Sequence, residues 1–346
     1  MNNGNLYEMK ILEQSKLTAV DLFCGAGIGA YGIKKSGYNI LYGIDNDKYA
    51  VRTYNHNIGN HAVCDDIRNC RSIPECDLII ATPVCKPFSI CGARRLTDDE
   101  LYGDLLAETL RILFDTLPKA LFFENVPGIV IGESLPIFNK FISDIENHGY
   151  RTYWKVVDSS LLGAPQARDR LYMVAIRDDI KYEFIPPKES SFNIKTQRDA
   201  FWDLRDKPNG YIKNHNTDKL SALYYSSFRS NFRQNRWDEP SASVMSSIQS
   251  ALLYPEPYVG KFDYKVLHSM RENEDFPRRL SVREHLRLQT VGDEFYFDDD
   301  IPLQEQYNRC SGIPSIVAYK YGLAIADCLL GKTNKRDIIL KRKTLF

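Results

Sequence analysis

The sequence carries no excess of charge of either sign, because its 346 residues include 45 Lys and Arg against 45 Asp and Glu. A net charge of zero neither requires nor excludes a polyanionic partner, so a surface for such a partner must be local. No run reaches the ~18 apolar residues of a membrane span, and the N-terminal segment lacks the apolar core of a signal peptide. We therefore expect a cytoplasmic protein with no membrane association.

Paired cysteines are also missing, since none of the eight Cys forms a C-x-x-C motif. Cys64, Cys70, Cys76 and Cys85 lie too far apart for a compact zinc site, so we expect no metal. Without a secretory signal, we expect the thiols to be reduced. The 43% of hydrophobic residues is enough for a sizeable core, which excludes a disordered chain or a small disulfide scaffold.

Short aliphatic or β-branched runs alternate with helical patterns in the first half of the chain. The runs occupy residues 17–23, 39–45, 77–83, 120–126 and 170–176. This alternation is typical of βα units and predicts an α/β fold with a doubly wound, mostly parallel sheet.

The alternation ends at Pro186 and Pro187, and an irregular, polar and aromatic region follows. Order returns in an amphipathic helix between Pro314 and Gly331, which we expect to pack on the first domain. The expected division is a first domain of residues 17–186 completed by the helical segment 306–331, a small irregular domain of residues 187–305, and a basic tail of residues 332–346.

A glycine-rich segment between the first strand and its helix suits a backbone that turns sharply and approaches a ligand closely. Asp45 ends the next strand, where a carboxylate accepts both hydroxyls of a ribose. Asp66 ends the third strand segment, where it would accept from an adenine amino group. The alternative for both acids is an N-cap or a surface carboxylate. The segment has no Lys or Arg for phosphates, so we predict a nucleoside ligand without a pyrophosphate.

A thiol and a carboxyl group follow two further strands. Cys85 stands in a loop between Pro83 and Pro87, and Glu124 ends the strand that comes next. Both positions are strand ends of a doubly wound sheet, where ligands bind. A buried structural Cys is the alternative, but the cationic side chains nearby favour a thiolate.

Two guanidinium groups precede the last strand, at alternate positions 168 and 170. Alternation places Arg168 and Arg170 on one face of an extended segment. Salt bridges to the sheet edge are the simpler interpretation of this pair.

In order and spacing, these segments resemble the cytosine carbon-5 methyltransferase family, from Leu17 to Gly331. DLFCGAGIG resembles the family's cofactor loop, Asp65-Asp66-Ile67 its adenine-contact segment, and TPVCKPFS its Pro-Cys-Gln loop. ENV is identical to its Glu-Asn-Val, and QARDR fits its Gln-x-Arg-x-Arg. RRLSVREHLRLQ resembles the penultimate motif, and RWDEPSASVMSS resembles the segment that often precedes that motif.

The resemblance implies a fold of the S-adenosylmethionine-dependent methyltransferase type and transfer of a methyl group to carbon 5 of cytosine in DNA. Cys85 would add to carbon 6 of a base flipped out of the duplex. Glu124, positioned by Asn125, would protonate ring nitrogen 3. Arg170 would bind the base carbonyl oxygen, and Arg168 would brace the thiol loop.

The resemblance also implies two sets of binding residues. Those for S-adenosylmethionine are Phe23, Cys24, Gly25, Ala26, Gly27, Ile28, Gly29, Asp45, Asn46, Asp66, Ile67, Pro83 and Leu105. Those for double-stranded DNA are Lys86, Ser89, Arg94, Arg229, Arg233 and Arg236. We further expect that the protein recognises a short target sequence, has a cognate restriction endonuclease as partner and is a monomer. If its source is prokaryotic or viral, we expect it to be associated with the nucleoid.

The middle region mixes basic and aromatic residues. The stretch from Leu204 to Trp237 contains seven Lys or Arg and only two Asp, with six aromatic residues interleaved. This mixture suits phosphate contacts and stacking. The alternative is an aromatic mini-core with a solvated rim.

The sequence departs from the family pattern at three places. Val84 stands where the family has Pro, and Lys86 stands where it has Gln. YNRCSGIPS stands where Gly-Asn-Ser-Val-Pro is expected. Three alternatives therefore stay open: an enzyme acting on RNA, a degenerate DNA-binding paralogue, and an altered alkyl donor. The RNA branch typically carries a Cys-Phe-Thr sequence, which is missing here, and the intact Cys85, Glu124 and Arg170 favour an active enzyme.

Overall fold

The computed structural model describes Met9 and residues 16–84, 99–217, 234–248, 252–256 and 277–335. Within these ranges no helix is both long and apolar enough to cross a membrane.

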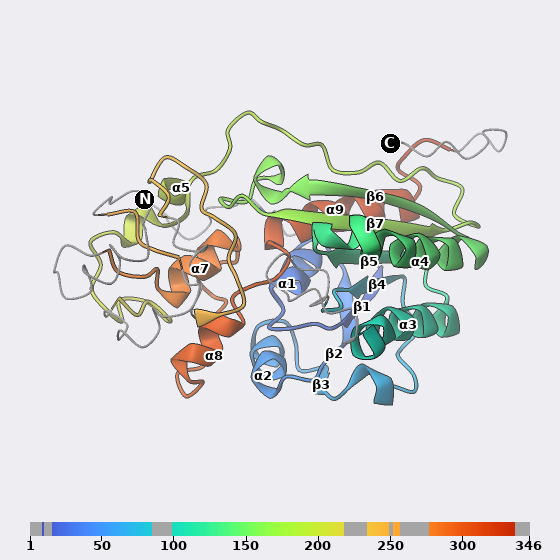
Figure 1. The fold of residues 1–346 in the computed structure, drawn as a ribbon, viewed down its shortest axis with the longest axis horizontal. Helices are drawn as coiled ribbons and strands as arrows, with labels where there is room; N and C mark the ends of the chain where they lie inside the picture. The colour runs from blue at the N-terminus through green and yellow to red at the C-terminus, as the bar shows by residue number, and fades with distance from the viewer. Residues whose placement is uncertain are drawn as a thin grey trace.

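The fold is organised around a seven-stranded sheet with the strand order β3-β2-β1-β4-β5-β7-β6 (Figure 1). The strands are β1 (Thr18–Leu22), β2 (Asn39–Asp45), β3 (Ala62–Cys64), β4 (Leu78–Ala81), β5 (Ala120–Asn125), β6 (Tyr150–Asp158) and β7 (Asp169–Arg177). Strands β1 to β5 are parallel, and β7 lies antiparallel between β5 and β6. The predicted doubly wound, mostly parallel sheet is confirmed.

Two strands differ from the regular βα pattern. The run at 170–176 does form a strand, but β7 is antiparallel because only the short η6 (Ser159–Leu162) and a few residues join it to β6, too few for a crossover. No apolar run predicts β6, since this edge strand exposes Trp154 and Lys155 at its centre. The sheet therefore ends in a β6–β7 hairpin.

Alternate residues of the central strands pack into two apolar layers, one on each face of the sheet. In β5, for example, Phe122 belongs to the first layer and Phe123 to the second, and both are fully buried. The first layer is covered by α1 (Ile28–Lys35), α2 (Lys48–Asn57) and α9 (Ser315–Leu329). The second layer is covered by η1 (Ile67–Asn69), α3 (Asp99–Thr116), η4 (Pro127–Val130) and α4 (Leu135–Asn147). The short η5 (Gly132–Ser134) directly precedes α4.

Helix α9 packs closely against α1. A Cβ atom on Gly32 of α1 would lie 2.1 Å from the carbonyl oxygen of Ser315, so only glycine permits this approach. α9 begins directly after Pro314 and is followed by Gly331 at φ +72°. The C-terminal helix is thereby fixed to the helix that follows β1.

The described residues between 197 and 308 form a second lobe beside the sheet (Figure 1). Its helices are α5 (Gln197–Phe201), η7 (Trp202–Leu204), α7 (Val282–Leu288) and α8 (Leu303–Asn308). The rings of Phe201 and Tyr254 both lie 5.3 Å from the ring of Trp237, between centroids. This aromatic cluster is continuous with the α1–α9 layer, so the second lobe shares its core with the sheet.

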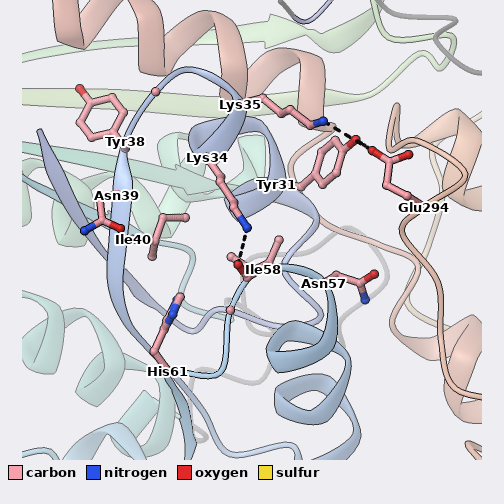
Figure 2. Close-up of a pocket in the computed structure, with 12 residues that line it drawn as sticks. Tyr31, Lys34, Lys35, Tyr38, Asn39, Ile40, Asn57, Ile58, His61 and Glu294 are labelled. Atoms are coloured by element: carbon pink, nitrogen blue, oxygen red, sulfur yellow. Dashed lines mark hydrogen bonds and ion pairs between the residues drawn. The ribbon is translucent and has the colours of Figure 1, made fainter. Parts of the chain in front are cut away.

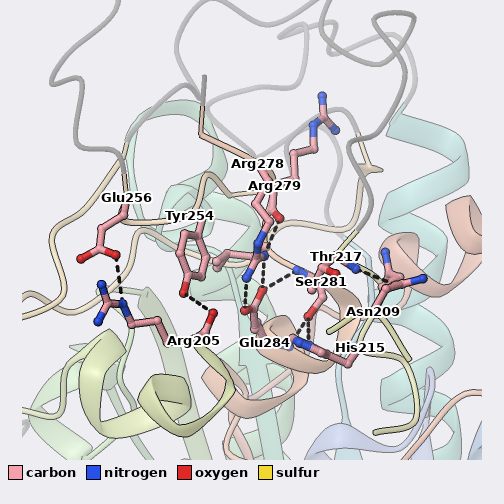
Figure 3. Close-up of polar contacts among 12 residues, drawn as sticks. Arg205, Asn209, His215, Thr217, Tyr254, Glu256, Arg278, Arg279, Ser281 and Glu284 are labelled. Carbon is pink, nitrogen blue, oxygen red and sulfur yellow. Dashed lines mark hydrogen bonds and ion pairs between the residues drawn. The ribbon is translucent and has the colours of Figure 1, made fainter. Parts of the chain in front are cut away.

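Helix α7 is buried along its whole length although its sequence is highly charged. Glu284 accepts from two guanidinium nitrogens of Arg278 at 2.8 and 2.7 Å and from the backbone N–H of Ser281 at 2.6 Å (Figure 3). Arg287 pairs with Asp293 at 2.7 Å. These buried charges are all paired, as the cost of desolvating an isolated charge requires.

Candidate active site

The glycine segment forms the turn between β1 and α1. Gly25 (φ +52°) and Gly27 (φ +89°) have left-handed backbone conformations that favour glycine. A Cβ atom on Gly27 would lie 2.7 Å from Cγ1 of Ile58, whereas one on Gly25 would meet nothing within 4 Å. The turn therefore needs both glycines, and the space beside Gly25 is open for a ligand.

Asp45 ties this turn to the end of β2. One carboxylate oxygen accepts from the backbone N–H of Gly25 and the other from that of Asp47, both at 2.9 Å. Burial raises the pKa of Asp45, although these two hydrogen bonds oppose the shift. The predicted cofactor acid thus lies at the turn, with its geometry fixed by backbone donors.

Asp66 has the N-cap geometry that was the alternative for this acid. Its carboxylate accepts from the backbone N–H of Arg68 and from Nε of the same residue, both at 2.9 Å. These contacts with Arg68 lower the pKa of Asp66 to about 2. The expected adenine contact stays a prediction.

The other predicted cofactor residues line the same end of the sheet. Cys24, Ala26, Ile28, Ile67 and Pro83 are buried, Phe23 and Leu105 are half-buried, and Asn46 is exposed. Gly29 has an ordinary φ, and a Cβ atom there would make normal contact with Ile313.

Glu124 and Arg170 meet at the carboxyl edge of the sheet. Their strands β5 and β7 are neighbours, and Nε of Arg170 lies 3.2 Å from Oε1 of Glu124. The side chain of Arg170 is only 15% exposed and that of Glu124 only 12%. A salt bridge at the sheet edge was the simpler interpretation of the arginines, and for Arg170 the structure shows such an ion pair with Glu124.

Asn125 links this edge to the loop that carries Cys85. Its buried side chain donates from Nδ2 to the carbonyl oxygen of Pro83 at 3.3 Å and accepts from the backbone N–H of Val126 at 2.8 Å. Pro83 is two residues before Cys85. Asn125 therefore fixes the start of the thiol loop, a contact that the sequence did not predict.

Arg168 contacts a different part of the molecule from Arg170. One terminal nitrogen donates to Ser243 Oγ at 3.0 Å and to the carbonyl oxygen of Val244 at 2.9 Å, and the other donates to Ser311 Oγ at 3.4 Å. Complete burial, with Arg170 nearby, lowers the pKa of Arg168 to about 9. Its described contacts thus join β7 to the second lobe and to the segment before α9.

The nucleophile candidate and most predicted DNA contacts lie outside the described residues. These are Cys85, Lys86, Ser89, Arg94, Arg229 and Arg233. Arg236 is described and exposed, and its backbone N–H donates to Glu239. Trp237 is buried in the aromatic cluster, which is the mini-core alternative for this residue.

A cavity of about 460 Å³ lies near the amino end of β2 (Figure 2). It is lined by Asn39 and Ile40 at the amino end of β2 and by Lys34 and Lys35 at the end of α1. Lys34 donates to the carbonyl oxygen of Ile58 at 2.6 Å. No predicted site residue lines this cavity, so it is distinct from the carboxyl edge.

The glycine turn, the buried acid beside it and the acid–arginine pair share one edge of a doubly wound sheet, which defines a fold of the S-adenosylmethionine-dependent methyltransferase type. The chain belongs to the C-5 cytosine-specific DNA methylase family, whose family model matches residues 17–325. It is therefore a DNA cytosine-5 methyltransferase.

Two curated Type II methyltransferases match most of this chain. The chain is 30% identical to the Type II methyltransferase M.FnuDI of Fusobacterium nucleatum, over 94% of this chain and 99% of that protein. It is 31% identical to the Type II methyltransferase M.BsuRI of Bacillus subtilis, over 80% of this chain and 63% of that protein.

Solved structures share the fold at low identity. The Dnmt2 methyltransferase of S. pombe matches with a TM-score of 0.65 and 18% identity, over 90% of this chain and 99% of that one. A putative DNA modification methyltransferase encoded within an E. coli prophage matches with a TM-score of 0.68 and 18% identity, over 91% and 100%.

Proposed function

We propose that this protein transfers a methyl group from S-adenosylmethionine to carbon 5 of cytosine in double-stranded DNA at a short specific sequence. The reaction proceeds by covalent addition of Cys85 to carbon 6 of a flipped-out base. The observation that carries the proposal is the Glu124–Arg170 pair, held through Asn125 and Pro83 beside the loop of Cys85. Family membership supports the overall chemistry.

The glycine turn fits a nucleoside cofactor. Open space beside Gly25 gives the ligand access to the backbone, and Asp45 retains acceptor lone pairs for ribose hydroxyls beyond its two backbone donors. We assign the remaining predicted residues, including Asp66 and Leu105, to the same site. When bound, S-adenosylmethionine supplies the electrophilic methyl group.

The protein's part of the reaction is nucleophilic and acid catalysis. The Cys85 thiolate forms a bond to carbon 6 while Glu124 delivers a proton to ring nitrogen 3, which makes carbon 5 an enamine carbon. Arg170 holds both Glu124 and the carbonyl oxygen of the base. After methyl transfer a water-derived base removes the carbon-5 proton, the thiolate is eliminated from carbon 6, and ring nitrogen 3 returns its proton to Glu124, which restores the aromatic ring.

Duplex DNA binds in this proposal to Lys86, Ser89, Arg94, Arg229, Arg233 and Arg236, since cations supply phosphate contacts. The Type II relatives support a role in restriction and modification, with a cognate endonuclease as partner. We further propose residues 187–305 as the recognition domain of a monomeric, cytoplasmic enzyme.

Trapping with 5-fluorocytosine tests the mechanism, because fluorine at carbon 5 prevents the final proton loss. Duplex DNA of random sequence, substituted throughout, should give a denaturant-resistant adduct with the wild type and S-adenosylmethionine. Cys85→Ser should give none. Glu124→Gln should form the adduct at least about 100-fold more slowly, because an amide cannot protonate the ring.

Fluorinated RNA distinguishes the competing substrate. Adducts on RNA but not on DNA would assign the enzyme to RNA. Folded protein that binds the cofactor but forms no adduct on either polymer would instead identify a degenerate DNA-binding paralogue.

A further inference from the structure

Arg309 joins the segment before α9 to the turn that follows β2. Its Nε donates to Oδ1 of Asp47 at 2.8 Å, and a terminal nitrogen pairs with Oδ2 of the same carboxylate. The other terminal nitrogen donates to the carbonyl oxygen of Glu305 at 2.9 Å. The guanidinium carbon also lies 5.3 Å from the ring centroid of Tyr49. A two-pronged contact of this kind fixes the carboxylate in one orientation.

Asp47 in turn connects to the cofactor turn. Its backbone N–H donates to Asp45, whose second oxygen accepts from Gly25. Its side chain also caps α2 by accepting from the backbone N–H groups of Tyr49 and Ala50. One continuous set of hydrogen bonds therefore runs from Arg309 through Asp47 and Asp45 to the glycine turn.

The charges in this set require a cation. The charge of Asp47 contributes to the raised pKa of Asp45, and Arg309 acts to lower the pKa of both carboxyl groups. Burial alone would raise the pKa of Asp47, but the contact with Arg309 and the capping amides lower it. Arg309 thus keeps the carboxylate of Asp47 ionised and in place.

We propose that Arg309 is a positioning residue for cofactor binding, which acts by holding Asp47 so that Asp45 and the glycine turn keep their ligand-binding geometry. The inference rests on the proposed function, in which S-adenosylmethionine binds at this turn. Arg309 lies in YNRCSGIPS, the segment in which this chain departs from the family pattern.

Arg309→Gln tests the proposal by separating cofactor binding from turnover. The Kd for S-adenosylmethionine, measured by calorimetry, and its KM should both rise about tenfold, as the loss of a charge-assisted contact implies. The value of kcat at saturating cofactor should stay within about twofold of the wild type. Arg309→Lys keeps the charge without the fork and should give an intermediate Kd.

Arg52→Gln is the matched control. Arg52 also bridges a sheet-side helix to aspartates of the second lobe, with Nε 2.9 Å from Asp298 and a terminal nitrogen 2.6 Å from Asp300. It has no described contact with the glycine turn. The control should leave the Kd for the cofactor unchanged while removing an interlobe ion pair of the same kind.

Asp47→Asn provides a second variant if Arg309→Gln does not fold. An Asn side chain still caps α2, so this change removes only the ion pair with Arg309. It should therefore raise the Kd for S-adenosylmethionine about as much as Arg309→Gln does. The double variant should have no higher Kd than either single variant. If Asp45→Ala weakens binding while Arg309→Gln and Asp47→Asn leave Kd unchanged, the inference is wrong and the proposed function stands. A lower kcat with unchanged KM also overturns the inference. If Asp45→Ala itself has no effect on Kd, the cofactor site of the proposed function is wrong.

Discussion

The carboxyl edge of the sheet and the second lobe use charged residues in opposite ways. The sheet is held by apolar layers, and the ion pair of Glu124 and Arg170 lies at strand ends beside the candidate site. In the second lobe, by contrast, α7 buries Arg283, Glu284 and Arg287 in a structural network. The Glu124–Arg170 pair at the sheet edge is therefore proposed to act in chemistry, whereas the buried charges of α7 hold the second lobe together.

The largest expected effect is on catalysis at the sheet edge. Arg170→Ala should lower kcat by about 10²- to 10³-fold, because it removes the donor proposed for the base carbonyl and leaves Glu124 without its partner. Thermal stability should change little by comparison. Methyl transfer from labelled cofactor measures the rate.

Arg177→Ala is the control for this prediction. Arg177 lies at the opposite end of β7 and pairs with Asp179 at 2.8 Å. Equal losses of activity in the two variants would mean that Arg170 acts through strand stability, and the distinction between the two regions would fail.

The next effect is on stability in the second lobe. Glu284→Ala should cost about 3–5 kcal/mol of unfolding free energy, because the nearly buried Arg278 would lose its partner. Glu108→Ala removes an Arg–Glu pair of the same 2.7 Å length at a more exposed position and should cost less than about 1 kcal/mol. Urea unfolding followed by circular dichroism gives both values. Similar costs for the two variants would contradict a structural role specific to α7.

A smaller effect concerns the proposed DNA surface. Neutralising Arg229, Arg233 and Arg236 together should reduce the slope of log binding constant against log salt by ~0.9 for each lost phosphate contact. A filter-binding salt titration measures this slope. Neutralising Lys140 and Lys155, which pair with acids elsewhere on the surface, should leave it unchanged. If the triple variant keeps both affinity and slope, DNA binds on another face.

The smallest expected effect concerns a buried acid beneath the glycine turn. Burial first, and Asp45 second, raise the pKa of Asp21 well above its ordinary value. The folded state therefore holds this proton more tightly than the unfolded state, and Asp21 makes folding less favourable as pH rises above the ordinary Asp range. Asp21→Asn should thus gain stability relative to the wild type as the pH rises above the ordinary Asp range. Unfolding at several pH values checks it, and a pH-independent difference would exclude titration of Asp21 as the cause.

Apolar periodicity was sufficient to predict most of the sheet and part of the site. β1, β2, β4 and β5 each lie within a predicted run, and β7 extends its run by one residue at each end, because strands buried on both faces are continuously apolar. The position of Arg170 beside Glu124 was not predicted, because it depends on the antiparallel direction of β7. Likewise, β6 was missed because an edge strand with exposed Trp154 and Lys155 has no such signal.

Contacts between distant polar side chains were not predictable from the sequence. The charges of α7 resemble those of a solvent-exposed helix face, and only the structure shows that Arg278 and Asp293 neutralise them. Nothing in the sequence pairs Arg309 with Asp47 or Asn125 with Pro83, since hydrogen bonds impose no periodicity.

The antiparallel direction of β7 has a consequence for biosynthesis. A nascent chain that ends before β7 already contains the glycine turn and Glu124, but it lacks Arg170. It also lacks Ser311, which Arg168 contacts, and Arg309, which Asp47 contacts. Because N-terminal segments fold first during translation, the acid would await its arginine until the hairpin emerges from the ribosome. The described contacts of Arg168 and Asp47 are therefore completed only when nearly the whole chain has been made.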